Sequence, residues 1–383
     1  DDGWFGTRND DNQGLGDWTV NCEKLPGGLD PLIGQVNALG MKFGLWIEPE
    51  MVCEDSDLYR EHPDWAFTIP GRKPVRARYQ LVLDYSRKEV VDGIFTQIAK
   101  VLDETKADYV KMDMNRHLTD AWSKTAGEQN QGAILHRYML GVYDFLERLH
   151  ERYPALLIEG CSGGGGRFDA GMLYYTPQIW CSDNTDAIER VKIQYGTSFA
   201  YPSCTVGSHV SAVPNHQTGR TTELATRAAV AMAGSFGYEL DLNLLTEEKE
   251  QVRAQIKNYH RFEMLIRQGR YYRLTDVWQK KEYAAWEYCR PDGSEALVTV
   301  VTLDTQCNPA TEYVKLRGLG EDKKYRVEVV GMQTGGENGQ RINGTPNSIE
   351  PEYFTGAQLV YAGVPVPRLG NEYKSWQVYV KEV

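Results

Sequence analysis

Residues 107–116 read Ala-Asp-Tyr-Val-Lys-Met-Asp-Met-Asn-Arg, an apolar run in which every second position becomes charged or carries an amide. Side chains alternate across a β-strand, so Lys111, Asp113 and Asn115 share one face of the strand predicted here. Such a face makes a poor core but a good active site, because a neighbouring cation favours the ionised carboxylate that a nucleophile must be. A buried, structural Lys111–Asp113 pair is the alternative interpretation.

Short strands alternate with helices on both sides of this stretch, from about residue 28 to residue 269. Strands are predicted at 41–50, 80–85, 108–115, 155–159, 178–183 and 237–242. Helices are predicted at 28–39, 86–106 with Ser86 as the cap, 132–152, 219–234 and 246–269. Residues 51–79 and 203–216 are expected to be loops. The alternation is typical of a parallel sheet covered by helices.

Polar side chains recur where these strands end, and in a (β/α)8 barrel the catalytic groups lie at those ends. They are Asp1, Asp2, Glu48, Lys111, Asp113, Asn115, Cys161 and Asp183. A doubly wound open sheet is the rival, but no G-x-G-x-x-G follows the first strand, and the polar groups occupy too many strands for one switch point. We therefore predict a (β/α)8 TIM barrel over residues 1–269. Its first strand is expected to be truncated, because residues 1–6 read as the end of a strand.

After residue 270 the pattern changes to a period of two between Gly, Asn and Asp turns. The alternating stretches are 295–303, 313–316, 325–330 and 376–380. Alternation of this kind is typical of antiparallel sheets. We predict a C-terminal antiparallel β-sandwich over residues 270–383.

Composition argues against several classes of protein. The net charge of −11 over 383 residues argues against nucleic-acid binding, and no apolar run approaches the ~18–20 residues of a membrane span. Histidines lack H-x-H or H-E-x-x-H spacing, so no metal or other cofactor is expected. Seven cysteines without C-x-x-C spacing favour a reduced, cytoplasmic compartment. The sequence begins at Asp1 and does not decide whether a signal segment lies upstream.

A second strand end carries acids: residues 180–186 read Trp-Cys-Ser-Asp-Asn-Thr-Asp. Two carboxylates at one barrel face suggest a glycosidase, which needs one ionised carboxylate and one general acid. Asp113 suits the ionised role. Asp183 suits the acid, because it follows apolar residues and has no lysine or arginine within five positions. Asp186 is the alternative acid, and a helix N-cap is the alternative use of Asp183.

Further candidates surround this pair of acids. The glycines at 163–166 follow a strand without a G-K-[ST] phosphate motif, so we expect backbone brought close to a ligand. Trp46 either stacks on a sugar ring or fills the barrel interior. Arg78 could reach a hydroxyl, as could the paired carboxylates of Asp1 and Asp2.

A cysteine nucleophile is a further alternative. Cys161 with His209 or His216 would provide the thiol and the base, but no orienting pattern supports this arrangement.

Taken together, these residues resemble glycoside hydrolase family 36, the α-galactosidases of bacterial type. The resemblance is carried by 1–6 (DDGWFG), 44–50 (GLWIEPE), 111–116 (KMDMNR), 159–169 (EGCSGGGGRFD) and 181–187 (CSDNTDA). It implies a retaining mechanism with Asp113 as nucleophile and Asp183 as acid/base. The residues that it implies for galactose binding are Asp1, Asp2, Trp46, Arg78, Lys111, Asn115, Cys161 and Gly163.

The resemblance also implies the substrate: terminal α-1,6-linked galactose in melibiose, raffinose and stachyose, hydrolysed through a covalent galactosyl-enzyme. Alternatives are an α-N-acetylgalactosaminidase or a galactosyltransferase of the same family, and a non-catalytic galactose-binding protein. Cys161 crowds the sugar's 2-position in the plain α-galactosidases, which disfavours an acetamido group. Family members carry an N-terminal β-supersandwich domain through which they often form tetramers. We therefore expect more residues upstream and, with that domain, a homo-oligomer.

Overall fold

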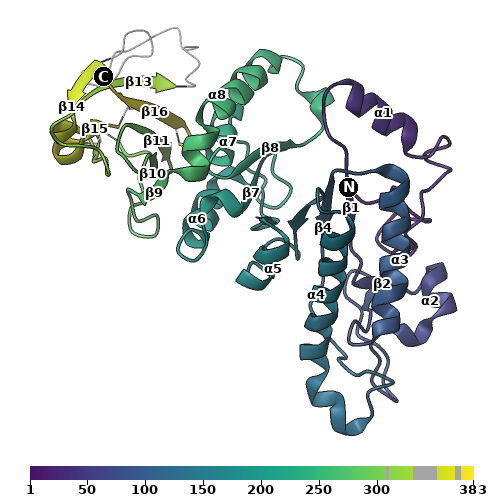
Figure 1. Ribbon diagram of the computed structural model, residues 1–383. Coiled ribbons are helices and arrows are strands. Elements are labelled where there is room, and N and C mark those ends of the chain that lie inside the picture. Colours follow the sequence, from purple (N-terminus) through teal and green to yellow (C-terminus); the bar gives the residue numbers. More distant parts are fainter. Residues whose placement is uncertain (308–309, 331–351, 367–371) are drawn as a thin grey trace. The chain divides into compact units, whose positions relative to one another are not determined.

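The computed structural model describes residues 1–307, 310–330, 352–366 and 372–383. The chain divides into two compact units, Asp1–Trp180 and Cys181–Val383. Figure 1 labels helices and strands of both units where there is room.

Parallel strands form the centre of the first unit. β1 (Gly44–Ile47) pairs with β4 (Tyr109–Met112), β4 with β5 (Leu157–Gly160), and β5 with β6 (Gln178–Trp180). The helices of this unit are α1 (Asp30–Ala38), α2 (Asp57–Glu61), α3 (Lys88–Thr105), α4 (Ile134–Arg152) and α5 (Ala170–Tyr175). This alternation of strand and helix agrees with the sequence pattern.

The register of these strands brings polar residues into one row. Trp46 is opposite Lys111, Lys111 is opposite Glu159, and Glu159 is opposite Gln178. β4 ends at Met112, so Asp113 is the first residue beyond the strand. The carboxyl ends of parallel strands lie at the same edge, which is where the predicted site residues of this unit gather.

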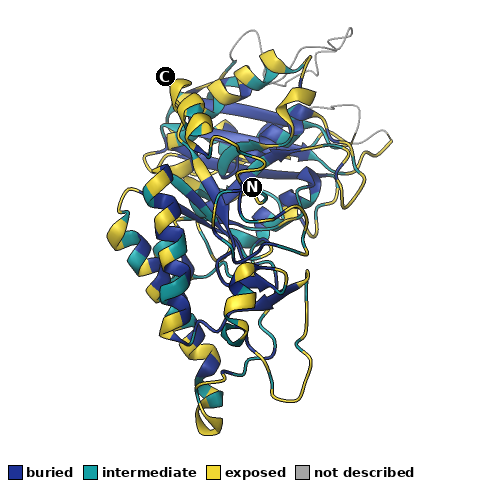
Figure 2. Ribbon diagram, turned by 90° about the vertical axis from the view of Figure 1, so that its right-hand side faces the viewer, coloured by how far each residue is buried: buried dark blue, intermediate teal, exposed yellow. Residues whose placement is uncertain are grey.

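α4 shows how the helices attach to the core. Its buried residues recur at intervals of three or four, which places them on one stripe of the helix. They are Ile134, Tyr138, Val142, Phe145, Leu146 and Leu149. The ribbon coloured by burial shows dark blue alternating with yellow along such helices (Figure 2). α4 lies beside α3 in Figure 1.

Two predicted loops contain regular structure, so those predictions were wrong. Residues 51–79 hold β2 (Met51–Cys53), α2 and a 3-10 turn, and β2 pairs antiparallel with β3 (Gln80–Val82). Residues 203–216 hold β7 (Val206–Ser211). β2 has only three residues, all buried, and β7 reads Val-Gly-Ser-His-Val-Ser, so neither shows an alternation of apolar and polar residues.

The predicted cap of α3 was also wrong. The N-cap position is Arg87, and the hydroxyl of Ser86 donates a hydrogen bond to the Asp84 carboxylate instead.

The second unit combines a parallel pair with antiparallel sheets. β7 pairs in parallel with β8 (Ser235–Glu239). The helices of the second unit are α6 (Ala187–Thr197), α7 (Leu224–Ala231) and α8 (Lys249–Gln268). The large antiparallel sheet has the order β14 (Glu352–Thr355), β13 (Lys324–Val330), β16 (Ser375–Glu382), β11 (Glu295–Thr302), β10 (Tyr283–Cys289) and β9 (Arg270–Arg273).

A smaller sheet completes this unit. β12 (Tyr313–Val314) pairs antiparallel with β15 (Val364–Pro365), and their valines join the core formed by one face of the large sheet. The antiparallel prediction for the C-terminal region is confirmed. α8 ends at Gln268 and β9 begins at Arg270, but the domain boundary at 269/270 stays a prediction.

Within the described parts of the chain, no helix combines the length and apolar character needed to span a membrane.

Candidate active site

The carboxylate of Asp113 accepts four hydrogen bonds from N–H groups. Oδ1 accepts from the backbone of Met114 at 2.7 Å and of Gly163 at 3.3 Å. Oδ2 accepts from Trp46 Nε1 at 3.2 Å and from Asn115 Nδ2 at 2.8 Å. An ionised carboxylate is acceptor-only and can satisfy donors on both oxygens. The surroundings of Asp113 are therefore those of a fixed, oriented carboxylate.

The donors come from three separate segments, which explains how the strand order builds the site. Trp46 stands on β1, Asn115 follows β4, and Gly163 lies in the loop after β5. Trp46 is itself fixed, because its carbonyl accepts a hydrogen bond from Trp4 Nε1 at 2.9 Å. Its ring also stacks on Phe5, with the planes 10° apart. The indole thus orients Asp113 through its N–H.

Lys111 forms an ion pair with Glu159. Its Nζ lies 3.9 Å from Glu159 Oε1 and 5.3 Å from the centre of the Trp180 ring. Glu159 is buried and accepts a hydrogen bond from the hydroxyl of Tyr109 at 2.6 Å. The polar row across β4 and β5 therefore holds Lys111 in place, while N–H groups hold Asp113.

Glu48 is a second carboxyl beside Asp113, and it is completely buried. Oε1 accepts the backbone N–H of Asn115, and Oε2 accepts Gln80 Nε2 at 3.1 Å. Burial and the negative charge of Asp113 raise the pKa of Glu48 to about 7. Glu48 therefore fixes the backbone of the residue whose side chain holds Asp113.

We expect this raised pKa to make stability depend on pH in a way that Glu48→Gln removes. Between about pH 4.5 and 7 the unfolded chain loses the Glu48 proton while the folded chain keeps it. The free energy of unfolding is therefore highest below this pH window and declines as the pH rises through it. Between pH 4.5 and pH 7.5 the unfolding free energy of wild type should therefore fall by on the order of 3 kcal/mol relative to that of Glu48→Gln.

Urea unfolding of both proteins at these two pH values measures this fall. Glu61→Gln, at an exposed position of α2, serves as the control. An equal difference between wild type and Glu48→Gln at both pH values would contradict the raised pKa.

A chain of charged groups connects the N-terminus to the loop that carries Arg78. The buried Arg8 pairs through Nε with Asp2 Oδ2 at 3.0 Å and through Nη2 with Asp11 Oδ1 at 3.3 Å. Arg78 Nη2 lies 3.5 Å from the same Asp11 oxygen. The backbone N–H of Asp2 donates to Asp1 Oδ1 at 2.8 Å. The structure thus gathers Asp1, Asp2 and Arg78 in one network.

The glycine loop turns sharply beside Asp113. Gly163 and Gly164 have φ values of +53° and +84°, a left-handed backbone conformation that residues other than glycine rarely adopt. The turn lets the Gly163 N–H approach Asp113. The predicted approach of this backbone to a ligand stays a prediction.

Cys161 precedes this loop and is buried. Burial, followed by the negative charge of Asp113, raises the pKa of the Cys161 thiol well above its usual range. A thiol held protonated is a poor nucleophile, which argues against the cysteine mechanism. His209, one of the two candidate bases for that mechanism, lies in the second unit, where its Nδ1 is 2.6 Å from Glu239 Oε2.

The second unit separates the roles of the two acids after β6. Asp186 caps α6, accepting the N–H groups of Ile188 at 2.8 Å and Glu189 at 3.2 Å. Arg220 Nη1 lies 2.6 Å from its Oδ1. Burial opposes ionisation, but hydrogen bonds from Thr218 and Arg220 hold the pKa of Asp186 below its ordinary value. Asp186 is therefore an ionised structural cap and a poor general acid.

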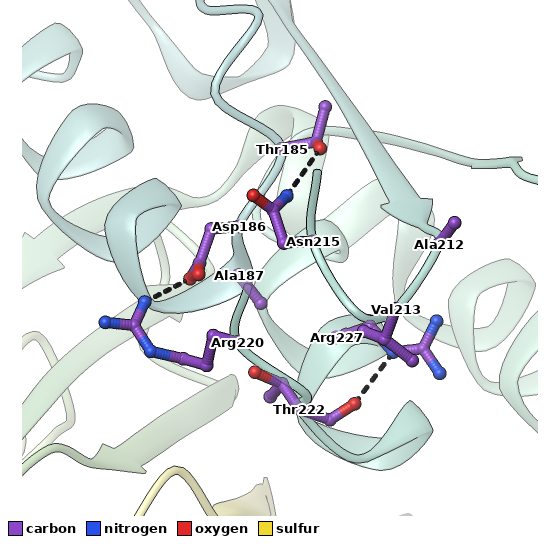
Figure 3. Close-up of a pocket in the computed structure, with 9 residues that line it drawn as sticks. All are labelled: Thr185, Asp186, Ala187, Ala212, Val213, Asn215, Arg220, Thr222 and Arg227. Atoms are coloured by element: carbon purple, nitrogen blue, oxygen red, sulfur yellow. Dashed lines mark hydrogen bonds and ion pairs between the residues drawn. The ribbon is translucent and has the colours of Figure 1, made fainter. Parts of the chain in front are cut away.

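Asp183 is exposed, and the cap of α6 is not its role. A small polar pocket adjoins the start of α6, with Arg220 directed at Asp186 and Asn215 at Thr185 (Figure 3). Arg227 closes it by donating to the carbonyl of Thr222 at 3.0 Å. Asp183 and Asp113 belong to different units. The convergence of their carboxyls on one glycosidic bond stays a prediction.

Among the described residues, no group of three or more His, Cys, Asp or Glu side chains is placed to hold a metal ion.

Two family models match the chain in succession. The melibiase model matches residues 1–269, and the model of the glycosyl hydrolase family 36 C-terminal domain matches residues 283–380. The chain belongs to the melibiase family. The predicted resemblance to glycoside hydrolase family 36 is thereby confirmed.

Curated relatives of this melibiase chain are named α-galactosidases. It is 56% identical to the bifunctional α-galactosidase/sucrose kinase AgaSK of Mediterraneibacter gnavus, covering 100% of this chain and 38% of that protein. It is 47% identical to the α-galactosidase AgaA of Geobacillus stearothermophilus, covering 100% of this chain and 50% of that protein. The melibiase chain thus spans half or less of the length of these relatives.

Solved structures of related proteins have a fold similar to that of this chain. A crystal structure of a Geobacillus stearothermophilus AgaA variant in complex with raffinose matches with a TM-score of 0.92 and 47% identity. The match covers 100% of this chain and 50% of that one. The galactosidase domain of AgaSK matches with a TM-score of 0.90 and 55% identity, covering 100% and 49%. The predicted fold class, a TIM-type α/β barrel followed by antiparallel sheets, is confirmed.

Several contacts at this site involve residues that the sequence did not mark as site residues. Arg8 and Asp11 link the predicted Asp2 and Arg78. Glu48 and Glu159 hold Asn115 and Lys111. The two glutamates end predicted strands, which was an available signal. Arg8 and Asp11 lie in an irregular segment, where no sequence pattern indicates a contact.

Proposed function

We propose that the protein is a retaining α-galactosidase that removes terminal α-1,6-linked galactose from melibiose, raffinose and stachyose. The observation that carries the proposal is the Asp113 carboxylate with its four N–H donors, in a chain of the melibiase family. Relatives solved with raffinose and with stachyose support the substrate class. The protein needs no cofactor for this reaction.

In the first step Asp113 attacks the anomeric carbon while Asp183 protonates the glycosidic oxygen, so the bond to the leaving sugar breaks. In the second step Asp183 takes a proton from water as the water oxygen attacks the same carbon. The galactosyl bond to Asp113 then breaks. The four N–H groups stabilise the negative charge that returns to the departing carboxylate.

The other predicted residues have binding roles in this proposal. Asp1, Asp2, Arg78, Lys111 and Asn115 offer polar groups to the galactose hydroxyls. Trp46, Cys161 and Gly163 shape the site around Asp113. Retention requires carboxyl oxygens of Asp113 and Asp183 about 5–5.5 Å apart, whereas about 6.5–9.5 Å would accommodate a water for inversion.

The stereochemistry of the product tests the proposal. We expect proton NMR of a reaction on raffinose to detect α-galactose as the first-formed anomer, followed by slow mutarotation. β-Galactose appearing first would exclude double displacement. Galactose binding without turnover would exclude the enzyme altogether.

Assembly and location complete the proposal. A homo-oligomer, expected as a tetramer, and a cytoplasmic location stay predictions. All seven cysteines are free in the structure, as a reduced compartment would allow.

A further inference from the structure

The backbone just before β3 is strained at two consecutive residues. Arg78 and Tyr79 have φ values of +50° and +59°, and the N–H of Gln80 donates to the carbonyl of Ala77 at 3.0 Å. These features define a tight turn of type I′, whose two central positions favour Asn-Gly. Strain of this kind persists where the surrounding structure enforces it and often accompanies function.

The segment after Asp113 enforces this turn. The buried guanidinium of Arg116 donates from Nη1 to the carbonyl of Val75 at 3.0 Å and to that of Gln80. Asp120 Oδ2 accepts the N–H of Val75 at 2.7 Å. The turn is therefore held from both sides by residues that follow the candidate nucleophile.

The turn is connected directly to the Asp113 site. Gln80 is completely buried and donates to Glu48, which accepts the N–H of Asn115, whose side chain holds Asp113. Tyr79 immediately precedes Gln80, yet 60% of its surface is exposed. A strained turn thus exposes an aromatic residue that stands in the sequence between Arg78, which pairs with Asp11, and Gln80, which is linked to the Asp113 site.

We propose that Tyr79 binds the leaving-group saccharide, with its ring packed against the pyranose that is attached to galactose. The proposal rests on the proposed α-galactosidase function. The buried polar groups around Asp113 suit the galactose itself, whereas an exposed ring on the turn that adjoins them suits the next sugar. A tyrosine offers that sugar an apolar face and one hydroxyl, with few rotatable bonds to fix.

The test compares two substrates that share galactose but differ in the leaving group. Raffinose carries a saccharide, whereas α-galactosyl fluoride carries none. Tyr79→Asn removes the ring and leaves a residue that tolerates positive φ. We expect the ratio of kcat/KM for raffinose to kcat/KM for the fluoride to fall about five- to tenfold. Tyr79→Phe, which keeps the ring, should restore most of that ratio.

Lys106→Asn is the matched control, because exposed Lys106 also has a positive φ, +52°, at the end of α3. Both asparagine variants should resist urea better than wild type, but Lys106→Asn should keep the wild-type ratio. An unchanged ratio in Tyr79→Asn would overturn this proposal alone, as would equal losses on both substrates. A wild-type protein that hydrolyses neither substrate would overturn the proposed function as well.

Discussion

Replacing Asp113 by alanine is expected to lower kcat/KM for α-galactosides by about 10⁴–10⁶-fold, as loss of a catalytic nucleophile does elsewhere. The expectation follows from the geometry of the carboxylate. Four N–H groups from three segments fix both of its oxygens. The side-chain N–H groups of Trp46 and Asn115 both donate to Oδ2.

Added azide gives this experiment a positive readout. In Asp113→Ala, azide can enter the space of the lost carboxylate and attack the anomeric carbon once, so the product should be β-galactosyl azide. In Asp183→Ala, azide should instead attack the galactosyl-enzyme and give α-galactosyl azide. NMR of the two products therefore assigns the nucleophile and the acid/base separately.

Asp108→Ala is the control for the first variant. Asp108 directly precedes β4, whereas Asp113 follows its other end, and Asp108 makes only a loose pair with Lys42 at 3.6 Å. Its replacement should leave turnover near the wild-type value. Turnover by a folded Asp113→Ala protein within tenfold of wild type would refute the nucleophile assignment.

The sequence predicted those parts of the site that one strand end reveals by itself. Asp113 and Asp183 could be proposed as the two acids because an apolar run meets a carboxylate at the end of each strand. The alternation Lys111, Asp113, Asn115 predicted a shared face, and the bond from Asn115 to Asp113 agrees with it.

The sequence could not predict contacts between segments far apart in the chain. The hydrogen bond from the Asn115 backbone to Glu48 spans 67 positions. The choice of Asp186 over Asp183 as the cap of α6 depends on where the helix begins, and propensity allows either. The ion pair between Lys111 and Glu159 could not be predicted for a related reason, because Glu159 becomes a neighbour of Lys111 only through the register of β4 and β5.

The largest expected loss of stability comes from Arg167→Met. Arg167 and the completely buried Glu50 form a two-pronged ion pair, with Nη1–Oε2 at 3.0 Å and Nη2–Oε1 at 2.7 Å. The hydroxyl of Tyr138 also donates to Glu50. Removing the guanidinium leaves a buried carboxylate without its counter-charge, which should cost about 3–5 kcal/mol of unfolding free energy. Urea unfolding measures this loss.

The same replacement should also impair catalysis, because Arg167 Nε donates to Ser162 Oγ at 2.8 Å and so anchors the loop that carries Gly163. Arg60→Met is the control, since its pair with Asp57 is exposed and should contribute little to the unfolding free energy. The double variant Arg167→Met/Glu50→Gln lacks both charges of this buried pair, so most of the lost unfolding free energy should return. Activity should not return with it, because the glycine loop still lacks its anchor. A double variant that recovers both stability and turnover would show that Arg167 acts only through the charge of Glu50.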